Sequence, residues 1–237
     1  MGTSSSYSSP TTLPWKRAKN ATSRFASGGG EAGGRSPALP IARFVQALGG
    51  AREAAREAPV GRAVANRLLA FGQATAQRGI DAALREFGLE DAVGLAADEA
   101  LQRIVDTLAA GANTLDETAA REALVDVIRE LLEDSDDVED AFGDLDVVGA
   151  LDLLRRFIAA YIFRRFAKAL GDRLRAHAES APAARRREEE MKRYIAAEVV
   201  IAFEDIDVET LDWRNDTERI IERCMREAFR TLGDEDA

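Results

Sequence analysis

The sequence has one cysteine, one histidine and no apolar run that is long and uncharged enough to cross a membrane. A single cysteine excludes a disulfide framework and favours a reducing compartment. The most apolar stretch, residues 147–166, contains Asp152 and four arginines, which is too much charge for a membrane span. Residues 1–20 also lack the apolar centre of a secretory signal. We therefore expect a cytoplasmic protein without a membrane-spanning segment.

Recognisable catalytic motifs are lacking as well. Neither a Walker-type phosphate loop nor a Gly-x-Ser-x-Gly nucleophile motif occurs, and no Glu-x-x-His pattern suggests a metal site. His177 falls near the end of a predicted long helix, where a cation offsets the helix dipole. Cys224 has the spacing of a buried helix residue. The sequence thus predicts a protein that is not an enzyme and that holds no cofactor or metal.

Residues 133–146 form the most acidic segment of the chain. A calcium loop beginning at Asp134 would need a ligand at its fifth position, but Val138 stands there. The segment therefore lacks the ligand pattern of a calcium loop. We interpret it as a solvated loop or as a face for a basic partner.

Composition and charge separate the two ends of the chain. Hydrophobic residues make up 46% of the sequence and aromatic residues only 6%, and abundant Ala, Leu, Arg and Glu favour helices. The formal net charge is −10, which argues against a nucleic-acid-binding protein. Residues 1–39, however, contain five basic residues and one acidic residue. This basic segment could fold back on the acidic remainder or steer toward an acidic partner.

The chain divides into a tail and a helical domain. Residues 1–38 are rich in Ser, Thr, Gly and Pro, and we expect them to form a disordered tail. From residue 39 to residue 237 the apolar residues recur with helical spacing, which predicts an all-α domain of about six to eight helices. A long helical hairpin is expected at about 146–203. The predicted helices cover about 41–48, 60–77, 81–87, 98–110, 114–134, 146–178, 183–203 and 216–232.

The N-terminus offers the most distinctive chemistry. Removal of Met1 would expose the α-amine of Gly2, and α-amines have a pKa of about 8, against about 10.4 for lysine. A usable fraction of this amine is therefore nucleophilic near neutral pH, and glycine has no side chain to obstruct entry into a narrow active site. The apolar island Leu13-Pro14-Trp15 is typical of a docking anchor, although a chance tryptophan in a linker is the alternative.

The first six residues also fit the N-myristoylation pattern, which leaves a lipidated peripheral protein as a third possibility. That reaction belongs to eukaryotic cells, whereas the Ala- and Arg-rich composition is typical of a high-GC bacterium. A single acyl chain would also bind a membrane only weakly.

The N-terminal residues resemble the opening of the QatB family, which belongs to the four-gene Qat anti-phage operons of bacteria. The residues that carry the resemblance are Met1-Gly2-Thr3-Ser4-Ser5-Ser6, Pro10 and Leu13-Pro14-Trp15. The resemblance implies three neighbours: an ATPase, a QueC-like enzyme and a TatD-like nuclease. QueC enzymes use ATP to activate a carboxylated 7-deazaguanine and normally pass it to ammonia.

A defence version of that enzyme could pass the activated base to the Gly2 amine instead, so the resemblance implies a chain that is itself modified. Thr3, Ser4, Ser5 and Ser6 would then lie extended in the enzyme channel, while Leu13, Pro14 and Trp15 would dock outside it. The partners implied are the QueC-like enzyme and, as a second candidate, the operon ATPase, without nucleic acid or membrane. The alternative is a helical adaptor that holds operon proteins together and carries an unmodified tail.

Overall fold

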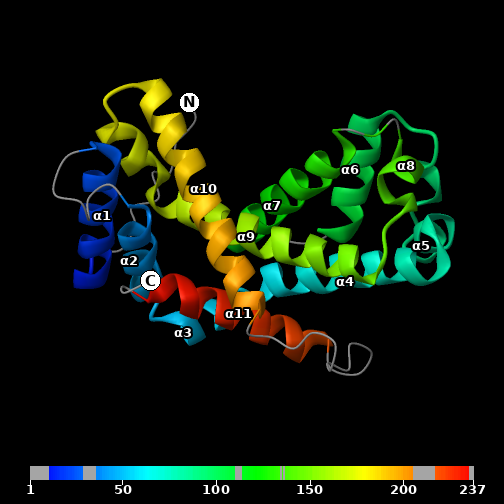
Figure 1. The fold of residues 1–237 in the computed structure, drawn as a ribbon, viewed down its shortest axis with the longest axis horizontal. Coiled ribbons are helices and arrows are strands. Elements are labelled where there is room, and N and C mark those ends of the chain that lie inside the picture. The colour runs from blue at the N-terminus through cyan, green and yellow to red at the C-terminus, as the bar shows by residue number, and fades with distance from the viewer. Residues whose placement is uncertain are drawn as a thin grey trace.

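The computed structural model describes residues 11–28, 36–109, 114–133, 135, 137–204 and 217–234, and all regular secondary structure in these ranges is helical (Figure 1). The predicted all-α class is therefore confirmed. The described residues contain eleven α-helices and one short 3₁₀ helix, η2. Their bounds are α1 Leu13–Ala26, α2 Ala38–Ala47, α3 Ala51–Arg56, α4 Pro59–Arg78, α5 Ile80–Glu86, η2 Glu90–Ala92, α6 Ala97–Leu108, α7 Leu115–Leu132, α8 Val138–Gly143, α9 Val147–His177, α10 Ala181–Glu204 and α11 Thr217–Gly233.

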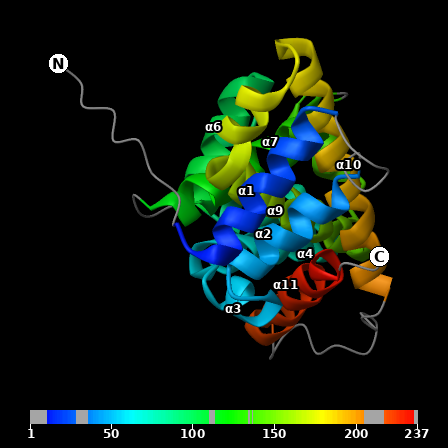
Figure 2. The same cartoon turned by 90° about the vertical axis from the view of Figure 1, so that its left-hand side faces the viewer.

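The core is organised around α9, the longest helix. It packs against α7, α4, α10 and α1, which surround it on several sides (Figures 1 and 2). For this reason its buried residues do not form a single stripe, as those of a surface helix would. They follow one another with few gaps along the middle of the helix: Leu153, Leu154, Phe157, Ile158, Tyr161, Ile162, Phe163 and Phe166.

The main helices lie where the sequence placed them, within a few residues. The predicted hairpin of 146–203 corresponds to α9 and α10. Pro182 lies in the first turn of α10, where a missing backbone N–H costs nothing. A capping box opens α7: the Glu117 carboxylate accepts from Thr114 N at 2.7 Å, and Thr114 Oγ1 accepts from Glu117 N at 3.3 Å.

Between α2 and α3 the chain turns at Gly49 and Gly50, whose φ angles are +94° and +89°. Residues that carry a side chain rarely adopt such φ angles, so this pair of glycines suits a sharp change of direction. The pair separates α2 from α3.

The expectation of a disordered tail reaching residue 38 is wrong for residues 13–26, which form α1. Pro14 suits the first helical turn, and the small residues Ala18 and Ala21 allow α1 to approach its neighbours closely, while Phe25 enters the core. Residues 1–10 and 29–35 lie outside the described residues.

The acidic segment 133–146 also contains a helix that the sequence did not predict. Asp137 caps α8 by accepting a 2.8 Å hydrogen bond from the backbone N–H of Asp140. Val138 and Phe142 are buried, and Phe142 meets Phe71 edge-to-face at a centroid distance of 5.4 Å. Two apolar residues are therefore enough to fold a segment whose charge indicated a loop.

A prediction follows from the close approach of α4 to α9. A Cβ added at Gly61 would lie 2.7 and 2.8 Å from two ring carbons of the fully buried Tyr161. We expect Gly61→Ala to lower the free energy of unfolding by about 1–3 kcal/mol, because the ring has no space to move into. Chemical denaturation measures the change.

Gly143→Ala is the matched control, since nothing lies within 4 Å of a Cβ at Gly143. Its unfolding free energy should stay within about 0.5 kcal/mol of the wild-type value or rise. Equal destabilisation by both substitutions would contradict the tight contact between α4 and α9.

Candidate functional site

The residues predicted to form the site fall into two groups in the structure. Gly2 and the four residues Thr3, Ser4, Ser5 and Ser6 lie outside the described residues. The apolar island Leu13, Pro14 and Trp15 forms the first turn of α1. The candidate site is therefore α1 together with the elements that hold it, because α1 fixes the position from which the preceding residues start.

Trp15 is packed within the chain. Its ring meets Phe44 of α2 edge-to-face at a centroid distance of 6.2 Å, and Phe44 in turn meets Phe166 of α9 at 5.6 Å. Such edge-to-face pairs are favourable beyond the area that they bury. Trp15 thus anchors α1 to the central helix, and only part of its surface remains for a partner.

Further contacts fix the rest of α1. Thr22 is fully buried and satisfies its hydroxyl group by donating to the carbonyl oxygen of Ala18 at 2.9 Å. Ser23 accepts a 2.9 Å hydrogen bond from Arg173 Nε on α9. Apolar and polar contacts together hold α1 along its length against α2 and α9.

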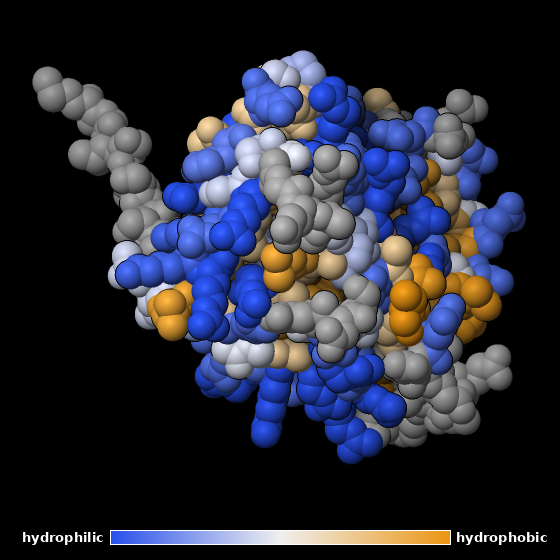
Figure 3. All heavy atoms as spheres, turned by 60° about the vertical axis from the view of Figure 1, so that its left-hand side comes forward, coloured by the Kyte–Doolittle hydropathy of each residue, from blue (hydrophilic) through white to orange (hydrophobic). Residues whose placement is uncertain are grey.

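The opposite side of α1 is exposed and basic. We call this side the outer face of α1, and its members recur at intervals of three or four residues, as one face of a helix requires. Leu13 is 61% exposed, and no residue of α1 is acidic. Figure 3 views the molecule from the side on which α1 lies and shows mostly hydrophilic side chains with small separate hydrophobic areas. The outer face of α1 consists of Leu13, Lys16, Arg17, Asn20 and Arg24.

The C-terminal end of α1 meets α10 through Arg187. The guanidinium carbon of Arg187 lies 5.0 Å from the centroid of the Phe25 ring, and Arg187 Nη1 donates to Glu190 at 2.7 Å. A cation beside the C-terminus of a helix also offsets the helix dipole. The end of α1 is thereby tied to the beginning of α10.

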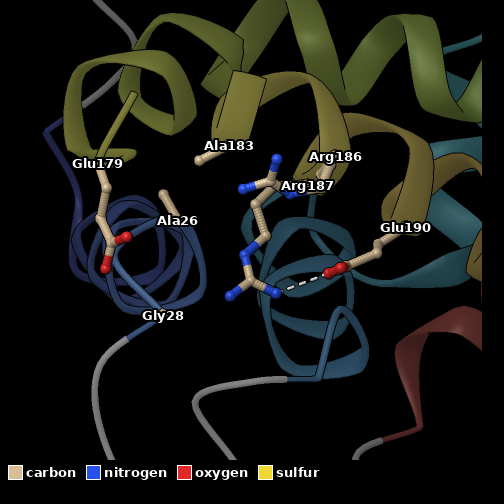
Figure 4. A pocket seen from close by; sticks show the side chains of 7 residues that line it. All are labelled: Ala26, Gly28, Glu179, Ala183, Arg186, Arg187 and Glu190. Carbon is tan, nitrogen blue, oxygen red and sulfur yellow. Dashed lines mark hydrogen bonds and ion pairs between the residues drawn. The ribbon is translucent and has the colours of Figure 1, made fainter. Parts of the chain in front are cut away.

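A cavity of about 140 Å³ lies at this junction, between the end of α1 and the turn from α9 to α10. Figure 4 shows Glu179 and the end of α1 on one side of it, and Arg187 and Glu190 on the other. Its lining consists of small residues, two arginines and two glutamates, without a nucleophile or a histidine. The balance of charges suits a joint between helices better than a catalytic centre.

A wider groove of about 630 Å³ runs between α7, α9 and α10. Ala159 and Phe163 contribute apolar surface, and charged side chains surround them. Several of these charges are paired across or along the groove, as Arg156 is with Glu130 at 3.2 Å and Lys192 with Glu189 at 2.8 Å.

The remaining candidate residues have structural surroundings. Exposed His177 lies in the last turn of α9, with Nδ1 3.1 Å from the carbonyl oxygen of Arg173. Burial raises the pKa of Cys224 to about 12, so its thiol stays protonated at neutral pH. Burial also raises the pKa of Tyr161, whose hydroxyl group donates to Asp116. Among the residues that the structure describes, no group of three or more potential ligands could hold a metal ion.

No helix in the described ranges has both the length and the apolar character needed to span a bilayer. This statement covers those ranges only.

The partners of α1 were missed at the level of sequence. Nothing in the sequence connects Phe44 or Arg187 with residues 13–26. One signal was present: Trp15, Ala18, Thr22 and Phe25 have the spacing of one helix face. It was weak because Ala and Thr are barely apolar and because serine- and glycine-rich stretches flank the segment.

Comparison with known proteins identifies the family. The model of the family described as "Qat anti-phage system associated protein QatB" matches residues 49–232. No curated protein and no solved structure matches the chain significantly. The match covers α3 to α11 except for the last residue of α11, and it lies entirely outside the N-terminal residues that carry the resemblance noted from the sequence. Since it spans most of the chain, this protein belongs to the QatB family of Qat anti-phage systems.

Proposed function

We propose that this component of an anti-phage defence system is a substrate, and that it presents the Gly2 amine to a QueC-like enzyme for conjugation to a 7-deazaguanine base. Membership of the QatB family establishes the link with anti-phage defence. The conjugation and the partner are our inference. In this proposal the chain is the substrate of an enzyme and is not an enzyme itself.

The observation that carries the proposal is the attachment of α1 to the central helix through Trp15, Phe44 and Phe166. It gives the N-terminal segment a fixed starting point at residue 13. The eleven residues from Gly2 to that point could span at most about 40 Å if extended. This reach is enough for the amine to enter an active site while the helical domain stays outside it.

The proposed reaction balances without a redox partner. The enzyme would adenylate the carboxylate of a 7-deazaguanine with ATP and release pyrophosphate. The unprotonated Gly2 nitrogen would attack the acyl carbon, a C–N bond would form, and the C–O bond to AMP would break. AMP leaves with the electron pair, and the amine loses a proton to solvent or to the enzyme. The product is an amide between the base and the chain.

The structure changes the predicted role of the apolar island in this encounter. Trp15 packs on Phe44, so an enzyme that approaches the tail meets Leu13 and the first turn of a fixed helix. Thr3, Ser4, Ser5 and Ser6 keep their proposed place in the enzyme channel. Leu13 and Pro14 would touch the rim of the active site.

The alternative function is a helical adaptor whose N-terminal segment is never modified. The groove between α7, α9 and α10 favours it, because a concave surface with apolar parts suits a partner protein. In that role the helical domain would hold the operon proteins together, including the ATPase.

Intact-mass analysis tests the conjugation. We expect the protein co-expressed with its QueC-like neighbour to lose Met1 and gain the mass of one 7-deazaguanine acyl group, located on Gly2 by fragmentation. Gly2→Glu should abolish the gain, because the active site would have to accept a charged side chain. An unmodified chain, or an unchanged gain in Gly2→Glu, would contradict the proposal.

A pair of deletions separates substrate from adaptor. Removing residues 2–11 leaves α1 and its Trp15 contact in place, so the melting temperature should be unchanged while protection against phage is lost. Removing residues 2–15 should also lower the unfolding free energy by at least about 1 kcal/mol, because the Trp15–Phe44 pair goes with it. Full protection by the shorter deletion would favour the adaptor.

A further inference from the structure

Two surfaces of the molecule have complementary charge and matching apolar centres. The first is the outer face of α1, where Lys16, Arg17 and Arg24 are exposed around Leu13. None of these three cations forms an ion pair with another described residue. By contrast, exposed arginines elsewhere are commonly paired, as Arg103 is with Asp91 at 2.9 Å.

α4 shows that a lack of acidic residues within a helix need not leave its arginines unpaired. It also has no carboxylate of its own, yet its Arg62 binds Glu222 of α11 at 3.0 Å and its Arg78 binds Glu86 of α5. The cations of α1 have no such neighbours among the described residues, so their charge is available to another molecule.

The second surface is the corner where α8 gives way to α9. Val148 is 72% exposed and Val147 50% exposed, which is unusual for large apolar side chains. Asp140, Asp144 and Asp146 are exposed beside them in the sequence, and none forms an ion pair within the described part of the chain. We call these five residues the α8–α9 corner.

The two surfaces cannot meet within one molecule. α1 lies at one end of the longest axis and α8 at the other, with the length of α4 and α9 between them (Figure 1). The end view agrees, because α1 lies nearest the viewer there (Figure 2). The outer face of α1 therefore does not contact the acidic corner of its own chain.

We propose that the outer face of α1 docks on the α8–α9 corner of a second copy of this chain. Lysine and arginine would face aspartates, and Leu13 would contact Val147 and Val148. The two patches differ, so the contact is heterologous: each molecule keeps one free patch, and the assembly grows until it closes into a ring or continues as a chain. This inference does not depend on modification of Gly2.

A second copy fits these observations better than other acidic partners do. The apolar side of α1 is turned inward against α2 and α9, so α1 cannot insert it into a lipid surface. The net charge of −10 opposes a polyphosphate backbone. The aspartates and valines of the corner, in contrast, match both the charge and the exposed leucine of α1.

Sedimentation velocity of the purified full chain tests the proposal. We expect concentration-dependent association in about 50 mM salt that weakens at least about tenfold in about 500 mM salt, because salt screens exposed charges. Reversal of the α1 patch, Arg17→Glu with Arg24→Glu, should give a monomer. Reversal of the corner, Asp140→Lys with Asp144→Lys, should do the same.

The variant that combines both reversals is decisive. It restores opposite charges across the interface, and its net charge equals that of the wild type. It should associate again. The control Arg129→Glu with Arg223→Glu adds the same negative charge as the α1 reversal but on the exposed surfaces of α7 and α11, outside both patches, and it should associate like the wild type. Thermal unfolding establishes that each variant is folded.

Three results would overturn the proposal. One is a wild-type chain that stays monomeric at low salt, and another is association that survives reversal of the α1 patch. The third is a combined variant that is folded but monomeric. If α1 reversal instead leaves the mass unchanged and abolishes binding to a single-stranded oligonucleotide or to phosphatidylserine vesicles, the outer face of α1 serves one of those partners and not a second copy.

Discussion

The contact of Phe44 with two other aromatic rings holds the N-terminal part of the molecule to the rest. Phe44 receives Trp15 from α1 on one side and Phe166 from α9 on the other, each in an edge-to-face arrangement. Without this contact, α1 would lose its largest apolar side chain as an anchor. Everything proposed for the N-terminus depends on it, because it fixes the position of α1, and the N-terminal residues directly precede α1 in the sequence.

Family membership and proposed function rest on different parts of the chain. The QatB match begins at residue 49, after α2, whereas the proposed modification concerns residues that precede α1. The two parts are nevertheless one physical unit, since α1 and α2 pack on α9 and α11, which lie inside the matched region. The helix that follows the N-terminal residues is therefore part of the same packed body as the region that defines the family.

The pairing of charges differs between the surroundings of the central helix and the two ends of the molecule. Around α9 exposed charges form pairs, as Arg156 does with Glu130, and such pairs add little to stability. At the outer face of α1 and at the α8–α9 corner the charges lack partners within the described chain. Unpaired charge of opposite sign at opposite ends favours contacts between molecules over contacts within one.

The sequence by itself determined the helical class and most helix positions. Apolar periodicity is a local property, and so is the Thr114–Glu117 capping box, so both could be read without knowing the fold. The first family resemblance was likewise local, since it came from the opening residues.

Only the tertiary structure shows that the segments of α1 and α8 form helices. Their own residues are too polar or too few to predict a stable helix, and each is held by aromatic rings from distant segments: Phe44 for Trp15 of α1, and Phe71 for Phe142 of α8. Helices of this length gain most of their stability from packing and little from propensity. That is why residues 13–26, which read as part of a disordered tail, in fact form a fixed helix, and why only the fold shows which face of that helix remains free.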